Sequence, residues 1–174
     1  SAPLPTGPLE ERRPLKGLRR KIAERMALSR HTAAHFTYVE ECDMTEIVSL
    51  RELAKAQALA KGTKLTYLPF IIKALVPALR EFPFVNSSLD DATGEIVLKR
   101  TYHIGIAVDT PDGLMVVNVR DADRKSLWEL AREIERLAAA ARTGKATREE
   151  LTGSTFTITS TGNVGGLLAT PIIN

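Results

Sequence analysis

The chain has 174 residues, of which 44% are hydrophobic and 26% charged, and it carries a formal net charge of +3. This length suits one domain with its own core and leaves little room for two. No stretch approaches the roughly 18 uninterrupted apolar residues of a membrane-spanning helix, and the first residues do not form a secretory signal. We therefore expect a soluble, intracellular protein that does not engage a membrane.

Positive charge is concentrated at the start of the chain. Residues 1–30 hold eight Lys or Arg against three Glu, whereas the remainder is slightly acidic. A basic helix can bind nucleic acid, but this stretch has no interleaved aromatic residues and no recognisable reading motif. We expect a solvated helix face or an anionic ligand there, and no nucleic acid.

The cysteine and the histidines argue against a metal site. Cys42 is the only cysteine, so it has no disulfide partner, which fits a reducing compartment, and we expect it to pack within a strand. His31, His35 and His103 have no second ligand at metal-binding spacing. His103 lies opposite the apolar stripe of its strand, and we interpret it as structural.

The first elements are a linker and a basic helix. Residues 1–14 contain four prolines and little that could be buried, which indicates a flexible linker, so the folded domain spans residues 15–174. From Leu15 the pattern becomes helical, with one apolar stripe made by Leu18, Ile22 and Met26.

A strand and a second helix follow. The stretch "HFTYVEECD", residues 35–43, has the β-branched and aromatic content of a strand. Asp43, with Glu46 three residues on, can cap the next helix. The buried face of that helix is predicted to consist of Ile47, Leu50 and Leu53.

A third helix is predicted from Thr66, whose hydroxyl can accept from an unpaired backbone N–H, to a stop at Pro83. Its apolar positions are Leu68, Ile72, Leu75 and Leu79.

The second half of the chain reads as strands around one further helix. Strands are predicted at 95–100, 102–110 and 114–119, with "TPDG" as a tight turn between the last two. Ser126 and Glu129 form a capping box for a helix that carries Leu127, Leu130, Ile134 and Leu137. The stretch "STFTITS", residues 154–160, supplies a last strand. This irregular alternation predicts an α/β sandwich with a mixed sheet.

The last strand carries the best chemical lead. Phe156 and Ile158 point to one side, and the threonines Thr155, Thr157 and Thr159 point to the other. An ordinary sheet with a solvated face would give the same pattern. However, the glycine-rich "TGNVGG" that follows would let a ligand approach the backbone, and a hydroxyl there could donate to an oxyanion. The serine-hydrolase elbow and the phosphate-binding loop are both absent, and "GNVGG" lacks the full dinucleotide-loop spacing.

Several segments together resemble one family, the dihydrolipoyl acyltransferases that form the core of 2-oxo acid dehydrogenase complexes. The resemblance runs from about residue 15 to the end of the chain. The segments are, in order, "LRRKIAERMALSR", "AHFTYVEECDMTEIVSLRE", "KLTYLPFIIKAL", "FPFVNSSLD", "HIGIAVDTPDGL", "ELTGSTFTITSTG" and "TPIIN".

The resemblance implies a fold similar to chloramphenicol acetyltransferase, a two-layer sandwich with a mixed sheet. It implies homotrimers that build a hollow cage and serve the decarboxylase and dihydrolipoyl dehydrogenase subunits. It further implies transfer of an acyl group from the dihydrolipoyl arm of an upstream lipoyl domain to coenzyme A. The proline-rich start would be the tether, and the location would be the cytoplasm in bacteria or the mitochondrial matrix in eukaryotes.

The resemblance also assigns residues. Thr159 stands where the family carries its oxyanion hydroxyl, usually a serine. The positions that match coenzyme A contacts are Arg51, Thr66, Asp109, Thr159 and Ser160. From the residues alone, Arg51 could be a surface helix residue, Thr66 only a cap and Asp109 only a turn residue.

Two positions depart from the family pattern. The general-base histidine belongs to a D-H-R-x-x-D-G motif after "PIIN", and the sequence given does not contain it. We therefore expect a catalytic domain incomplete at its C-terminus and inactive by itself; a non-catalytic scaffold subunit is the alternative. Val117 replaces the usual proline. The segment "AHFTYVEECDMTEIVSLRE" and the asparagine of "VVNV" look most like the branched-chain members, with acetyl transfer as the other possibility.

Overall fold

The computed structural model describes residues 10–160 and 168–173. The chain divides into two compact units, Ser1–Phe36 with Ile172–Asn174, and Thr37–Pro171.

The first unit contains helix α1, Gly17–Thr32. The helix begins two residues later than predicted and buries none of its residues. Its apolar stripe of Leu18, Ile22 and Met26 is half-buried. Residues 10–14 of the predicted linker form neither helix nor strand and are exposed.

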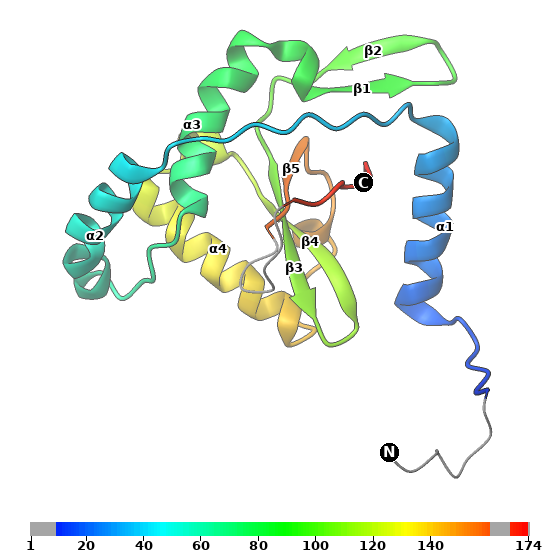
Figure 1. The fold of residues 1–174 in the computed structure, drawn as a ribbon, viewed down its shortest axis with the longest axis horizontal. Coiled ribbons are helices and arrows are strands. Elements are labelled where there is room, and N and C mark those ends of the chain that lie inside the picture. Colours follow the sequence, from blue (N-terminus) through cyan, green and yellow to red (C-terminus); the bar gives the residue numbers. More distant parts are fainter. Residues whose placement is uncertain (1–9, 161–167, 174) are drawn as a thin grey trace, which may run out of the picture. The chain divides into compact units, whose positions relative to one another are not determined.

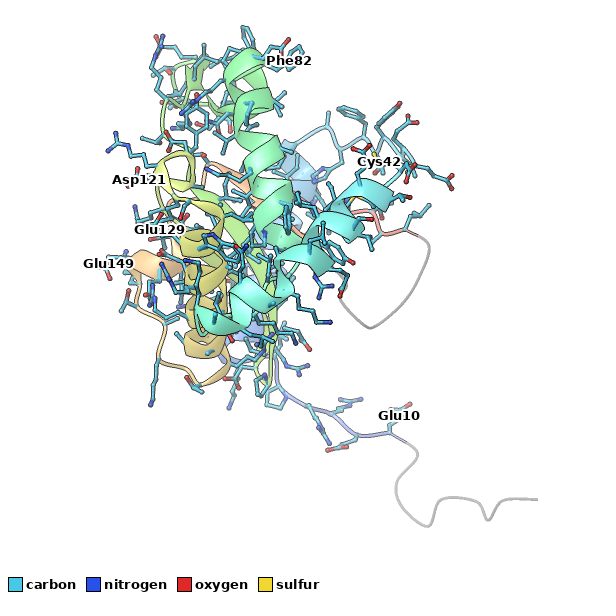
Figure 2. The ribbon with its side chains drawn as sticks, turned by 90° about the vertical axis from the view of Figure 1, so that its left-hand side faces the viewer. Glu10, Cys42, Phe82, Asp121, Glu129 and Glu149 are labelled. Carbon is cyan, nitrogen blue, oxygen red and sulfur yellow. The ribbon has the colours of Figure 1, made fainter. Side chains whose placement is uncertain are left out.

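The segment predicted as a strand at 35–43 is not one. Within the described residues no ladder includes it, and Phe36 and Tyr38 are 90% and 76% exposed. A strand forms only where a neighbouring strand pairs with its backbone N–H and C=O groups. The β-branched residues of a segment favour the extended backbone but do not provide that neighbour. Cys42 is exposed just ahead of the next helix (Figure 2), so the expectation of a packed strand cysteine is wrong.

Helix α2, Thr45–Ala60, starts close to the predicted position, although Met44 is its N-cap. Asp43 Oδ1 accepts hydrogen bonds from the backbone N and the Oγ1 of Thr45, at 2.9 and 2.6 Å, so it binds the first turn without forming the predicted box with Glu46. The predicted buried face is wrong for two of its three members, because Leu50 and Leu53 are exposed.

The covered face of α2 is a different one. Its members are spaced four, three and four residues apart, which is one side of a helix, and they are Ile47, Arg51, Ala54 and Ala58. Ala58 is buried in a small cluster with Leu65 and Ala131, so α2 is attached through small residues rather than through leucines.

Helix α3, Leu68–Glu81, carries more of the core. It buries Pro69, Ile72, Val76 and Leu79 and ends before Pro83, as predicted. Its N-cap is Tyr67, which makes no side-chain cap bond, so the capping role predicted for Thr66 is wrong. A 3₁₀ turn, Pro83–Asn86, follows.

A separate hairpin follows α3. Its strands are β1, Ser87–Asp90, and β2, Glu95–Leu98, paired antiparallel. β1 was not predicted, because "SSLD" is short and polar; β2 is the N-terminal part of the strand predicted at 95–100.

The main sheet has three strands in the order β4-β3-β5. β3, Ile104–Thr110, pairs antiparallel with β4, Gly113–Val119, and parallel with β5, Phe156–Ile158. The sheet is therefore mixed, as predicted. β3 is thus the central strand, and Figure 1 shows α3 and α4 to one side of the sheet.

Helix α4, Leu127–Arg142, completes the layer. The predicted capping box is present: Ser126 Oγ accepts from Glu129 N, and Glu129 Oε2 accepts from Ser126 N. The core lies between the two helices and one face of the sheet, and its largest fully buried members include Ile72, Leu79, Ile104, Leu130, Leu137, Val117 and Val119. This two-layer α/β arrangement is the predicted fold class.

Candidate functional site

Thr159 and Ser160 follow β5 directly and are both exposed. β5 pairs with β3 so that Ile158 lies opposite Ile106. Because β3 and β5 are parallel, Thr159, Ser160 and the exposed Asp109 lie at the same end of the mixed sheet. The glycine-rich stretch 161–167 lies outside the described residues.

The hydroxyl face of β5 is the face that turns away from the core. Phe156 and Ile158 pack against the core cluster, as the alternation predicted. Thr157 lies over Gly105, since a Cβ placed on Gly105 would come within 3.0 Å of Thr157 Oγ1. The same Cβ would lie 2.8 Å from Val116 Cγ1 of β4, so glycine is required here by the close approach of both neighbouring strands.

The three threonines do not have one common role. Thr155 Oγ1 accepts from His103 N at 3.2 Å, and Thr155 N donates to His103 O at 2.7 Å. Its hydroxyl therefore fastens the start of β5 to the start of β3. Thr159, at the other end, is the exposed hydroxyl beyond the ladder.

Arg51 is held in place by one neighbour on α2 and two residues of the connection between α2 and α3. Its Nε donates to Leu65 O at 2.9 Å, its Nη1 pairs with Glu52 Oε1 at 2.7 Å, and its guanidinium carbon lies 4.9 Å from the centroid of the Tyr67 ring. Because a guanidinium carries five N–H donors, these contacts fix its plane and leave donors for an anion.

The structure brings Arg51 and Thr66 together, since Arg51 binds both neighbours of the half-buried Thr66. Among the described residues, no hydrogen bond joins this pair to Thr159 or Asp109. The residues assigned by resemblance therefore form two groups, one at the α2–α3 connection and one at the end of the sheet. Tyr67, the platform beneath Arg51, was missed, because an aromatic residue before a helix carries no signal of that contact.

The first unit holds a polar contact that the sequence did not indicate. His35 Nδ1 lies 3.0 Å from Ala33 O, and His35 Nε2 accepts from Ile173 N at 3.0 Å. Ser29 Oγ donates to Ile173 O at 2.6 Å. His35 and Ser29 therefore hold the backbone of Ile173 against the end of α1.

His103 is structural, as predicted. Its Nδ1 accepts from Asp121 N at 3.0 Å, which holds the turn after β4. Within residues 10–160 and 168–173, no group of three His, Cys, Asp or Glu is arranged to hold a metal ion. No helix in this part of the chain is long and apolar enough to cross a bilayer.

Comparison with known proteins defines the class. Residues 7–174 match the model of the 2-oxoacid dehydrogenases acyltransferase catalytic domain, and the chain belongs to this family.

Relatives and solved structures agree with that assignment. The chain is 46% identical, over all of its length, to the dihydrolipoyllysine-residue acetyltransferase component of the pyruvate dehydrogenase complex of Bacillus subtilis. Over 94% of its length it is 49% identical to the lipoamide acyltransferase component of the branched-chain alpha-keto acid dehydrogenase complex of Pseudomonas putida. It spans 40% and 39% of the lengths of these two relatives.

Two solved structures share the fold. The dihydrolipoamide acetyltransferase of Azotobacter vinelandii matches with a TM-score of 0.92 and 40% identity, covering 99% of this chain and 73% of that one. A truncated catalytic core of the 2-oxoacid dehydrogenase multienzyme complex of Thermoplasma acidophilum matches with a TM-score of 0.89 and 42% identity, covering 95% and 75%.

Proposed function

We propose that this chain transfers an acyl group from an S-acyl dihydrolipoyl arm to coenzyme A as part of the core of a 2-oxo acid dehydrogenase complex. The proposal rests on family membership and on relatives named as acyltransferase components of such complexes. The structural observation that carries it is the exposed position of Thr159 directly after β5.

The reaction exchanges one thioester for another. The sulfur of coenzyme A attacks the acyl carbonyl, a tetrahedral oxyanion forms, and the bond from the carbonyl carbon to the dihydrolipoyl sulfur breaks. The thiol proton of coenzyme A ends on the departing dihydrolipoyl sulfur, through a general base. Thr159 donates its hydroxyl hydrogen to the oxyanion, where the negative charge develops.

Coenzyme A is anionic through its phosphates, and Arg51 has the chemistry to bind them. A guanidinium fixed on the Tyr67 ring presents forked donors with permanent charge. Thr66 beside it, and Asp109 and Ser160 near Thr159, supply further polar contacts in this proposal.

The wider setting is also proposed from the family. The acyl donor is the lipoyl group of an upstream lipoyl domain, and the working form is a homotrimer within a cage that serves the decarboxylase and dihydrolipoyl dehydrogenase subunits. A matching structure is described as the cubic core of the pyruvate dehydrogenase multienzyme complex. The bacterial relatives support a cytoplasmic location.

We infer a branched-chain acyl group as the substrate. Relatives of the acetyl type and of the branched-chain type are 46% and 49% identical, so identity does not separate the two. Comparison of isobutyryl- with acetyl-dihydrolipoamide decides between them: kcat/KM favours isobutyryl if the inference is right, and a preference for acetyl overturns it.

The proposed contact of Arg51 with coenzyme A is tested by calorimetry, which measures the dissociation constant of coenzyme A from the full chain. Arg51→Ala should weaken binding by roughly 10-fold or more, since hydrogen bonds to charged groups contribute about 1.5–3 kcal/mol, and the loss should shrink at high salt. Lys55→Ala is the matched control, because it removes the same charge one turn further along α2 from an exposed side chain. Equal effects of the two variants would remove Arg51 from the site.

The proposed role of Thr159 as oxyanion donor is tested by the rate of acyl transfer. This rate is measured in a chain extended beyond Asn174 by the histidine segment of the family. Thr159→Ala should lose about 10²–10³ in kcat, the usual effect of one oxyanion donor, and Thr159→Ser should retain most of the rate. If the extended parent binds coenzyme A without turnover, a scaffold role replaces the proposed one.

A further inference from the structure

Asn118 on β4 is a buried polar residue that the reaction itself does not use. Asn118 is only 2% exposed. It pairs with Gly105 of β3, and Gly105 pairs on its other side with Thr157 of β5. Asn118 Nδ2 donates to Thr152 O at 2.7 Å. Its Oδ1 is buried without a hydrogen-bond partner among the described residues.

The bond from Asn118 reaches the loop that leads into β5. This loop follows a 3₁₀ turn at Glu149–Leu151 and turns at Gly153, whose φ of +81° suits glycine. Arg120 Nη2 also donates to Glu149 O and Thr152 O, at 2.9 and 3.2 Å. The loop is thus tied to the end of β4 through the carbonyl of Thr152.

The tie matters because β5 is short. Only Phe156–Ile158 pair with β3, so few ladder bonds fix where this strand lies. Thr155 fastens its start to His103, and Thr152 fastens the loop three residues earlier. Thr159 follows immediately after the ladder, so its position depends on these two anchors.

Stability alone does not explain an asparagine at this position. A buried amide oxygen without a partner costs about 1–3 kcal/mol, whereas the one bond that Nδ2 makes returns about 0.5–1.5 kcal/mol. An apolar residue of similar size would remove the unpaired oxygen and lose only the bond to Thr152.

We propose that Asn118 is a positioning residue: through the carbonyl of Thr152 it sets the place of β5, and thereby of the Thr159 hydroxyl. Its connection to catalysis rests on the proposed acyl transfer. Its connection to β5 does not, since that part concerns the fold of the chain and is measurable without turnover.

The first measurement is amide hydrogen exchange of the full chain. In Asn118→Val, the amides of Phe156–Ile158 should exchange roughly 2- to 10-fold faster, which is the loss of one hydrogen bond, while the unfolding midpoint in denaturant changes little. Unchanged exchange in β5 overturns the proposal.

Asn86→Val is the matched control. Asn86 is equally buried, has the same unpaired Oδ1, and donates its Nδ2 hydrogens to Lys99 O and Thr101 O instead of to the loop before β5. Thr101 O also accepts from Thr155 Oγ1 at 3.2 Å, but Thr155 keeps its own bonds to His103 without Asn86. This variant should lose more stability than Asn118→Val and disturb β5 exchange less. If Asn86→Val speeds amide exchange in β5 more than Asn118→Val does, faster exchange there reflects a general loss of stability, and the proposal is overturned.

The second measurement separates positioning from binding. In the extended chain, Asn118→Val should lower kcat by roughly 10- to 100-fold, since displacement by an ångström has effects of that order, and leave KM for coenzyme A within about 2-fold. An unchanged kcat in an active parent overturns the inference. If the extended parent chain itself has no turnover, the proposed function fails. Amide hydrogen exchange in β5 then still shows whether Asn118 holds that strand.

A measurement on the unaltered chain covers the case in which Asn118→Val does not fold. The Nδ2 hydrogen bonded to Thr152 O and the amide hydrogens of Phe156–Ile158 should share one opening event and respond alike to small amounts of denaturant. If the Nδ2 hydrogen opens independently of β5, Asn118 does not hold the strand.

Discussion

Two helices of equal length are attached to the same unit in different ways. α2 and α4 each have 16 residues, but α4 buries five of them and α2 buries only Ala58. The apolar residues of α4 recur on one stripe that packs against the sheet, and they are Leu130, Ile134, Leu137 and Ala141. On α2, Leu50, Leu53 and Leu59 are exposed.

The difference shows what apolar spacing can determine. Spacing identifies a helix and its possible inward face, but the partner surface decides which face is covered. α4 meets a sheet whose residues need large side chains opposite them. α2 meets Leu65 and Ala131, where an alanine at position 58 is what fits.

The largest expected effect is in the core beneath α4. Leu137 is fully buried against β3 and β4, so Leu137→Ala should lower the free energy of unfolding by about 2–5 kcal/mol through lost burial and a residual cavity. Denaturant unfolding followed by circular dichroism measures it. A loss below about 1 kcal/mol would mean that α4 is attached no more firmly than α2.

The second effect is at the helix starts. Ser126→Ala removes the acceptor of the capping box and should cost about 1 kcal/mol, whereas Ser126→Asp keeps an acceptor and should cost less. Thermal unfolding of the two variants gives the comparison. If Ser126→Ala and Ser126→Asp lower the unfolding temperature equally, the capping box does not stabilise α4. The start of α4 would then be no better stabilised by local hydrogen bonds than the start of α2.

Local chemistry explains which parts of the fold the sequence could predict. The Ser126–Glu129 box, the stop at Pro83 and the turn between β3 and β4 depend on residues within a few positions, and all three were predicted correctly. The strand at 35–43 and the face of α2 depend on surfaces that are distant in sequence, and both predictions were wrong. β1 was missed because four residues with a single leucine among them have no strand signal until β2 pairs with them.

The candidate site shows the same limit. The alternation in β5 was enough to predict that Phe156 and Ile158 pack on the core and that Thr157 turns away from it. The bond from Arg51 to Leu65 O spans 14 positions, and that from Asn118 to Thr152 O spans 34, and no periodic pattern encodes such contacts. Asn118 was noted only as a mark of acyl type, whereas its bond to the loop emerges from the folded chain.

A smaller effect is expected from pH at the start of α4, where Glu129 lies (Figure 2). The Ser126 hydroxyl and backbone N–H both donate to the Glu129 carboxylate and lower its pKa below the ordinary glutamate value. A carboxyl with a lowered pKa in the folded state contributes stability above its unfolded pKa and loses that contribution as pH falls through the folded pKa.

Carbon-detected NMR titration of the carboxyl measures this. The Glu129 midpoint should lie below the ordinary value in the parent chain and rise toward it in Ser126→Ala. On α2, the Thr45 hydroxyl and N–H lower the pKa of Asp43 in the same way, so Thr45→Ala serves as the counterpart and should raise that pKa by loss of the hydroxyl bond. If the Glu129 midpoint is the same in the parent chain and in Ser126→Ala, the hydrogen bond from the Ser126 hydroxyl to Glu129 is contradicted.

The smallest effect is expected on the outer face of α2. Leu53 is 79% exposed, so Leu53→Ala removes little buried surface, and alanine is the better helix former. The free energy of unfolding should stay within about 0.5 kcal/mol of the parent, as for other exposed positions. Leu137→Ala, the same substitution on α4, is the matched comparison. A concentration-dependent loss above about 1 kcal/mol for Leu53→Ala would show that another copy of the chain covers this face, and the contrast between the helices would then hold only for the isolated chain.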